Sequence, residues 1–242
     1  MLTKIDRAKL DNYFNELAKI YKKKSHGYVF EFVLVGGASI LVNYNFRDTT
    51  NDIDAFFLPS ADIKDAIHAV SEKFSISANW INNDFQKTKS FSNKLSTFST
   101  YYKAYKNIIT VRTIKDEYLI AMKLMSGRKY KNDISDIVGI ISSARDLGND
   151  ISFQMIDNAV NNLYGNWKRI DEDMVEILHL VLKTKNLKEL YEETIKEENN
   201  SRLQLLDFND TYNVTINESN INDILKMLNK NSGSHNAHYY LF

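Results

Sequence analysis

The most restrictive feature of the chain is a pair of glycines between an apolar segment and a helix-compatible one. Residues 32–39 read Phe-Val-Leu-Val-Gly-Gly-Ala-Ser, and residues 28–35 have the composition of a buried strand. Glycines just before a helix let backbone N–H groups approach an anion closely. The segment therefore predicts a strand, a tight turn at Gly36 and Gly37, and a helix over 37–45 whose first turn can bind phosphate.

A second feature is the sequence Asp52-Ile53-Asp54, which begins a predicted strand over 52–58. Residues two apart on a strand point to the same face, so the two carboxylates would project side by side. Carboxylates this close repel each other unless a cation lies between them, and a divalent cation takes oxygen ligands of this kind. The two features together predict a site for a metal–nucleotide complex.

The bulk composition restricts the class of protein but does not identify an activity. Of the 242 residues, 43% are hydrophobic, 31 are Lys or Arg and 31 are Asp or Glu, so net charge argues neither for nor against a nucleic-acid partner. The chain has 0 cysteines, which excludes disulfides and thiolate metal sites and fits a reducing cytoplasm. We find no apolar segment long enough for a signal peptide or a membrane span, so we expect a cytoplasmic protein without a membrane partner.

Hydrophobic periodicity divides the chain into a mixed part and a helical part. The mixed part contains helices over 6–23, 116–126 and 132–147, a helix capped by Ser60 or Asp62, and strands over 101–105 and 108–114. Beyond residue 150 only helices are predicted, over 152–164, 171–185, 187–199 and 220–230. We therefore expect an α+β fold, with one domain over residues 1–150 and a helical C-terminal domain over residues 151–242.

Lys123 is the one polar residue of an otherwise apolar helical segment, residues 118–125. A buried ammonium is costly unless it has an anionic partner or reaches a cleft. Arg128, Asp133 and Asp136 follow, and the two aspartates share a helix face because they lie three residues apart. Such a set can bind phosphates and order a nucleophile, or it can form a structural ion-pair cluster. The residues alone leave both interpretations open.

These motifs resemble those of a known enzyme superfamily. Gly36-Gly37-Ala38-Ser39 followed by Thr50-Asn51-Asp52-Ile53-Asp54 resembles the signature of the polymerase-β-type nucleotidyltransferases. Within that superfamily, the block from Leu119 to Ile137 is similar to that of the AbiEii-like toxin family and its uncharacterised relatives. In that family the block contains a lysine on a helix, then an arginine, and then a pair of acids. Lys123, Arg128, Asp133 and Asp136 occupy these positions here. The resemblance covers roughly residues 30–145.

The resemblance implies a nucleotidyltransferase-like small mixed sheet flanked by helices, and an enzyme that depends on Mg²⁺ or Mn²⁺. Such an enzyme moves a nucleoside monophosphate from a nucleoside triphosphate, such as ATP, to a hydroxyl of an RNA (for example tRNA) or of a protein. The resemblance also implies a toxin of a toxin–antitoxin or abortive-infection module, with a cognate antitoxin protein as partner.

The same resemblance suggests a role for each matched residue. Asp52 and Asp54 would bind the metal. Gly36, Gly37 and Ser39 would bind the phosphates, together with Arg47 and Arg128. Lys123, Asp133 and Asp136 would complete the catalytic set, with Lys123 offsetting transition-state charge and an aspartate orienting Lys123 or activating the acceptor hydroxyl.

One departure from the superfamily pattern concerns the third metal-binding carboxylate, which normally lies on a neighbouring strand. The predicted strand 108–114 contains no acid. Asp84, Glu117, Asp133 or Asp136 could substitute for it. Otherwise the chain is a non-catalytic nucleotidyltransferase-like domain that binds a protein partner.

A third reading of the chain is a nucleic-acid-binding module, because lysines alternate with aromatic residues between residues 85 and 106. Exposed rings can stack on bases while lysines bind the phosphates. Alternatively the rings belong to the core and the lysines to solvated strand faces, which is the commoner arrangement. The residues concerned are Phe85, Lys87, Lys89, Phe91, Lys94, Phe98, Tyr101, Tyr102, Lys103, Tyr105 and Lys106.

Overall fold

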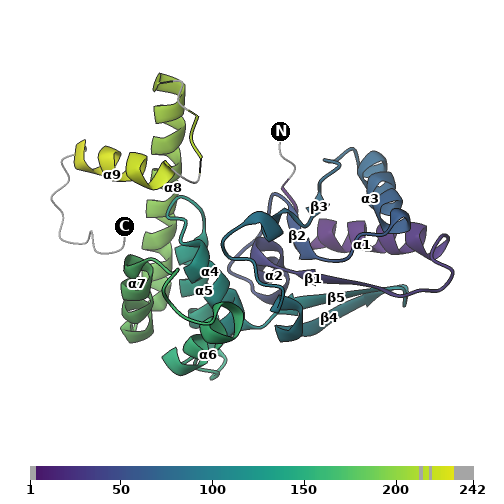
Figure 1. Ribbon diagram of the computed structural model, residues 1–242, viewed down its shortest axis with the longest axis horizontal. Helices are drawn as coiled ribbons and strands as arrows, with labels where there is room; N and C mark the ends of the chain where they lie inside the picture. Colours follow the sequence, from purple (N-terminus) through teal and green to yellow (C-terminus); the bar gives the residue numbers. More distant parts are fainter. Residues whose placement is uncertain (1–3, 213–214, 218–219, 232–242) are drawn as a thin grey trace. The chain divides into compact units, whose positions relative to one another are not determined.

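The computed structural model describes residues 4–212, 215–217 and 220–231 (Figure 1). The chain divides into two compact, interleaved units. Unit 1 comprises Met1–Met122 and Gln154–Trp167, and unit 2 comprises Lys123–Phe153 and Lys168–Phe242. The predicted α+β class is confirmed, whereas the predicted domain boundary at residue 150 stays a prediction.

The sheet of unit 1 is small and mixed, as expected. Its strands lie in the order β3-β2-β1-β5-β4, with β1 antiparallel to β2 and parallel to β5. β4 and β5 form a hairpin, and Lys106 (φ 50°) and Asn107 (φ 55°) make its turn in the left-handed conformation. The strands are β1 (Phe30–Leu34), β2 (Ile53–Phe56), β3 (Ile81–Asn82), β4 (Ser99–Tyr105) and β5 (Ile109–Ile114).

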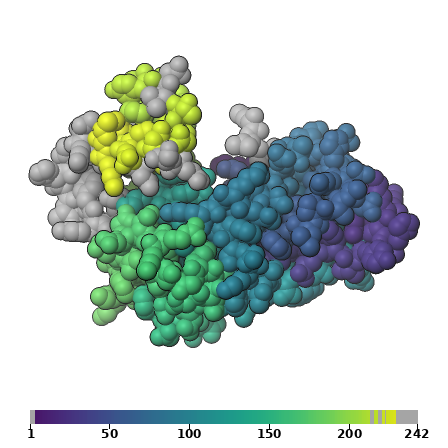
Figure 2. All heavy atoms as spheres, in the orientation of Figure 1, coloured from purple at the N-terminus to yellow at the C-terminus, as the bar shows by residue number. Residues whose placement is uncertain are grey.

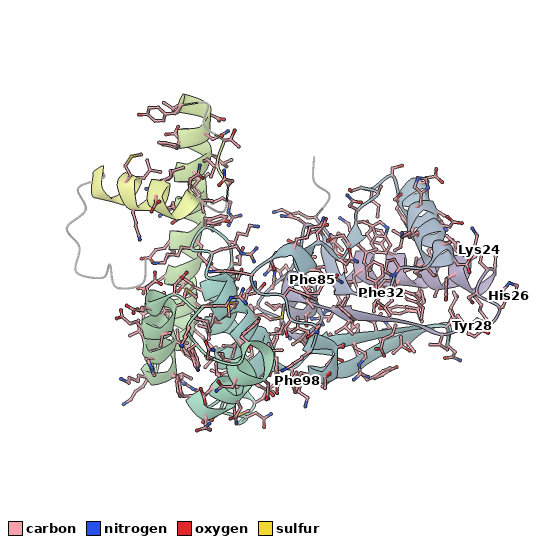
Figure 3. All side chains as sticks on the ribbon, in the orientation of Figure 1. Lys24, His26, Tyr28, Phe32, Phe85 and Phe98 are labelled. Atoms are coloured by element: carbon pink, nitrogen blue, oxygen red, sulfur yellow. The ribbon has the colours of Figure 1, made fainter. Side chains whose placement is uncertain are left out.

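Helices α1 and α3 pack against each other and bury their apolar sides against the sheet (Figure 1). Their outer residues, purple for α1 and blue for α3, form neighbouring surface in Figure 2. Phe32 lies in the interior beneath them, with its ring 5.6 Å from that of Phe14, whereas Tyr28 is exposed in the loop after α1 (Figure 3). The helices of unit 1 are α1 (Arg7–Lys22), α2 (Gly36–Asn43), α3 (Ala61–Phe74) and α6 (Phe153–Tyr164), with 3₁₀ turns η1 (Asp84–Lys87) and η2 (Leu95–Phe98).

The aromatic residues of the lysine-rich segment are mostly buried or partly buried. Phe85 and Tyr105 are buried, and the Phe98 ring stacks on Tyr118 with centroids 4.0 Å apart. Among the six aromatic residues of this segment, all of which the structure describes, Tyr101 is the exposed one. This distribution favours the core interpretation over an aromatic platform for bases.

Unit 2 is helical. α8 packs along α5, α7 also packs against α5, and α9 packs against α8. α4 (Asp116–Ser126) contributes residues to both units, since the division falls after Met122. The other helices of unit 2 are α5 (Asp133–Asp146), α7 (Glu172–Lys183), α8 (Leu187–Tyr212) and α9 (Ile221–Asn231). No helix among the described residues has the length and apolar character to cross a bilayer.

The predicted end of the helix at residue 199 is wrong, because α8 continues to Tyr212. Asn199 and Asn200 lie on the exposed side of this helix, which keeps one buried stripe beyond them. This stripe recurs every three or four residues and consists of Leu187, Leu190, Thr194, Glu198, Ser201 and Leu205.

Side-chain caps fix the starts of α1 and α3. The Asp6 carboxylate accepts a hydrogen bond from Lys9 N at 2.8 Å, and Ser60 Oγ accepts one from Ile63 N at 3.3 Å. Of the two caps that the sequence offered for α3, Ser60 is therefore the one used, while Asp62 lies in the first turn.

We expect Ser60→Ala to lower the free energy of unfolding by about 1 kcal/mol, because a backbone N–H at the start of α3 loses its acceptor. Ser60→Asp is the matched control and keeps the cap. Denaturant unfolding of both variants measures the difference. Equal stability of Ser60→Ala and the wild type would contradict the assigned cap.

Candidate functional site

The turn between β1 and α2 lies directly beside β2. Val35 N donates a hydrogen bond to Asp54 O at 3.0 Å, and the chain then turns at Gly36. Gly36 has φ +51°, a conformation that favours glycine. A Cβ atom at this position would lie 3.9 Å from Asp54 Oδ2. The first residue of α2 is therefore next to the second aspartate of the Asp-x-Asp motif.

Gly37 lies in close contact with two polar side chains. A Cβ atom there would lie 3.0 Å from Arg47 Nη2 and 3.0 Å from Thr50 Oγ1, so any larger residue would displace one of them. Thr50 Oγ1 also donates to Asp52 O at 3.0 Å, which fixes the backbone ahead of β2. We call this group, Gly36, Gly37, Arg47, Thr50 and Asp54, the glycine cradle.

The two aspartates differ in exposure. Ile53 and Ala55 are fully buried, so alternation turns the half-buried side chain of Asp54 to the opposite face of β2. Asp52 lies just before β2 and is exposed. The structure thus brings Gly36, Gly37, Arg47 and Asp54 together, as the sequence predicted for a phosphate and metal site.

Ser39 has a different environment from the one expected of a phosphate ligand. Its side chain is fully buried, and its Oγ accepts a hydrogen bond from Ile114 N at 3.3 Å. This contact joins α2 to the end of β5. The hydroxyl therefore has a backbone partner in the interior of unit 1.

The observed β5 contains no carboxylate, in agreement with the sequence. Arg112 of β5 donates to Ser99 Oγ at 2.7 Å and to Ser99 O at 2.8 Å. Within residues 4–212, 215–217 and 220–231, no three His, Asp or Glu side chains are grouped so that they could hold a metal. Mg²⁺ is commonly held by one or two carboxylates together with substrate phosphates. Asp52 and Asp54 are carboxylates of the kind that such a site uses, and metal binding by them stays a prediction.

Unit 2 contains a second group of predicted residues, which we call the ion cluster: Lys123, Arg128, Asp133 and Asp136. Lys123 Nζ lies 2.8 Å from Asp133 Oδ1 and 2.7 Å from Asp136 Oδ2. Arg128 Nε lies 2.8 Å from Asp133 Oδ2. Because Lys123 is 7% exposed and Asp133 0%, the anionic partner that the sequence required for Lys123 is present.

The ion cluster determines the protonation of Asp133. Burial alone would raise the pKa of this carboxyl, but Lys123 and Arg128 outweigh it and hold the pKa well below its usual range. A carboxylate with a low pKa is a weak base. Asp133 therefore suits the role of orienting Lys123 better than that of abstracting a proton.

Glu198 of α8 lies against the first turn of α5 and was not among the residues predicted for the site. Its Oε1 accepts hydrogen bonds from Ile134 N at 2.9 Å and Ser135 N at 3.3 Å, and its Oε2 accepts one from Ser135 Oγ at 2.5 Å. Burial raises the pKa of Glu198 to about 8, and the negative charge of Asp136 raises it further. The hydrogen bonds from Ile134 and Ser135 lower this pKa, but they do not offset the effect of burial. The feature that could have identified Glu198 is its position in the buried stripe of α8, in register with Leu190, Thr194 and Leu205.

Comparison with protein families matches residues 8–175 to the family described as Nucleotidyltransferase of unknown function (DUF6036). The chain belongs to this family. The match includes the glycine cradle and the ion cluster, whereas Glu198 lies outside the matched residues. Neither the search of curated proteins nor the search of solved structures gave a match.

We expect Lys123→Met to lower the free energy of unfolding by about 3–5 kcal/mol, because two buried carboxylates lose their shared counter-charge. Adding Asp136→Asn should recover part of the loss, since it removes one of the uncompensated charges. Denaturant unfolding of the two single variants and the double variant gives the coupling energy. Additive losses would show that the two groups do not interact.

We expect the wild type to lose stability as the pH rises from about 5 to about 8, because folded Glu198 keeps a proton that the unfolded chain releases. The loss amounts to about 1.4 kcal/mol for each unit by which the folded pKa exceeds the unfolded one. Glu198→Gln should flatten this dependence, and Glu193→Gln, on the exposed side of α8, should not. Denaturant unfolding at both pH values provides the test, and identical slopes for the three proteins would refute it.

Proposed function

We propose that this protein is a Mg²⁺-dependent nucleotidyltransferase that transfers a nucleoside monophosphate from a nucleoside triphosphate to an acceptor hydroxyl. The observation that carries the proposal is the glycine cradle. It combines a helix start at Gly36, a guanidinium packed on Gly37 and the carboxylate of Asp54. Family membership supports the same reaction class.

The phosphate part of the site is supplied by backbone and cation together. The first N–H groups of a helix and its dipole favour an anion, and Val35, the N-cap of α2, has no polar side chain to occupy them. Arg47 lies against Gly37 and adds a fixed positive charge. In the proposal these groups bind the β- and γ-phosphates and hold the triphosphate for attack at its α-phosphorus.

The metal part of the site consists of two carboxylates. Asp52 and Asp54 would hold Mg²⁺, or Mn²⁺ in its place, and the bound ion would neutralise charge on the leaving pyrophosphate. A bond forms between the acceptor oxygen and the α-phosphorus as the bond from that phosphorus to the pyrophosphate breaks.

The ion cluster supplies the remaining groups of the proposal. Lys123, held charged by Asp133, would offset negative charge that develops in transfer, with Arg128 as a second cation. Asp136 Oδ2 lies 2.7 Å from Lys123 Nζ. In the proposal, Asp133 or Asp136 orients Lys123 or accepts the proton of the acceptor hydroxyl.

We further propose an AbiEii-like biological role, based on the order Lys123, Arg128, Asp133 and Asp136. The protein would act in the cytoplasm as the toxin of a toxin–antitoxin or abortive-infection module. Its acceptor would be an RNA such as tRNA, or a protein, and a cognate antitoxin would be its partner.

A second candidate is a non-catalytic nucleotidyltransferase-like domain that binds a protein or a nucleic acid. The absence of a carboxylate on β5, a strand that the structure describes completely, favours it. Such a domain would keep the fold of unit 1 and bind nucleotide weakly, without transfer.

We expect Asp54→Asn to reduce label transfer from radiolabelled nucleoside triphosphates by at least about 100-fold, because a metal-binding charge is lost. The assay uses total RNA and cell lysate as acceptors, with Mg²⁺ or Mn²⁺. Asp48→Asn is the matched control, because this nearby aspartate is exposed and has no role in the proposed metal site. Label transfer that survives Asp54→Asn would eliminate the mechanism. No transfer by the wild type to any acceptor would support the non-catalytic candidate.

A further inference from the structure

A glutamate from the C-terminal helices completes the start of the helix that carries the acids of the ion cluster. α5 begins at Asp133, and its N-cap residue, Asn132, makes no side-chain cap. Glu198 of α8 takes this role instead, accepting hydrogen bonds from the N–H groups of Ile134 and Ser135. Helix starts need such acceptors, because their first N–H groups have no partner within the helix.

The geometry joins this cap to Lys123. The residues capped by Glu198 lie between Asp133 and Asp136, the two aspartates that bind Lys123 Nζ. The position of both carboxylates depends on the backbone of this single helical turn. We propose that Glu198 is a positioning residue for nucleotidyl transfer, which holds Asp133 and Asp136 so that they orient Lys123. The inference rests on the proposed function.

The surroundings of Glu198 favour a role in geometry over a role in charge. The ion cluster already balances two cations with two carboxylates, and the charge of Asp136 opposes a further negative charge at Glu198. Glu198 is fully buried, with Thr194 and Ser201 as its neighbours on the buried stripe of α8. A side chain that keeps an oxygen acceptor at the same distance from α5 should therefore replace it.

The inference also gives α8 a function within the site. The family match ends at residue 175, ahead of α8. If Glu198 orients the ion cluster, α8 is part of the catalytic apparatus of this chain.

The experiment compares three substitutions at one position. Glu198→Gln keeps length and acceptor oxygen, Glu198→Asp keeps the acid but is one methylene shorter, and Glu198→Ala removes both. We expect Gln to retain most of kcat. We expect Asp and Ala to lose about 10–100-fold in kcat, the usual cost of removing a group that orients an active residue. KM for the nucleotide should change little in all three, since its phosphates are assigned to the glycine cradle. Glu193→Ala, on the exposed side of α8, should behave as the wild type.

Amide hydrogen exchange supplies a readout that does not depend on activity. The N–H groups of Ile134 and Ser135 should stay protected in the Gln variant and lose protection in the Asp and Ala variants. If the Ala variant does not fold, the comparison of Gln with Asp decides. An active Asp variant with an inactive Gln variant would overturn the proposal, as would wild-type kcat in a variant whose two amides exchange freely. If the wild type transfers no label, the proposed function fails. The exchange pattern then decides whether Glu198 holds the turn, and unchanged protection in the Ala variant would overturn that too.

Discussion

Both edges of β1 are hydrogen-bonded, one to β2 and the other to β5. Pairing on both sides fixes the direction of β1. The hydrogen bond from Val35 N to Asp54 O fixes the point, relative to β2, at which the chain leaves the sheet. The turn at Gly36 follows at once. The positions of the helix start and of Asp54 are therefore consequences of strand pairing. Arg47 and Thr50 come from the segment between α2 and β2.

Unit 2 depends on a different constraint, the balance of buried charge. Lys123 cannot remain on an apolar helix without anions, and Asp133 and Asp136 cannot be buried without cations. Each group makes the burial of the others possible, so the ion cluster defines the register between α4 and the first turn of α5. A group whose arrangement is specified this tightly can serve both structure and chemistry.

The sequence predicted those features that depend on short-range pattern. Alternation placed Ile53 in the core and Asp54 on the other face, and the isolation of Lys123 in an apolar segment required a nearby anion. The limits of α1, β1 and β5 followed from periodicity to within two residues, and Ser60 marked the start of α3, whereas β3 was not predicted. These predictions succeed because each one depends on residues that are close together in the chain.

The features that the sequence did not reveal depend on contacts between distant segments. Nothing near Ser39 indicates that Ile114 N will use its hydroxyl. Glu198 is one of many glutamates in a polar helix, and only the full length of α8 reveals that it belongs to the buried stripe. The resemblance identified a site within roughly residues 30–145. It could not identify residues outside that range, such as Glu198, that contact the site.

The interleaving of the two units has a consequence for synthesis on the ribosome. α6 belongs to unit 1, where Ser92 Oγ donates to Leu163 O at 3.0 Å and Tyr164 Oη donates to Ser90 O at 2.7 Å. Unit 1 therefore includes a segment that is translated after α5, and α5 packs against α8, which is translated later still. A polypeptide interrupted after α5 lacks segments of both units.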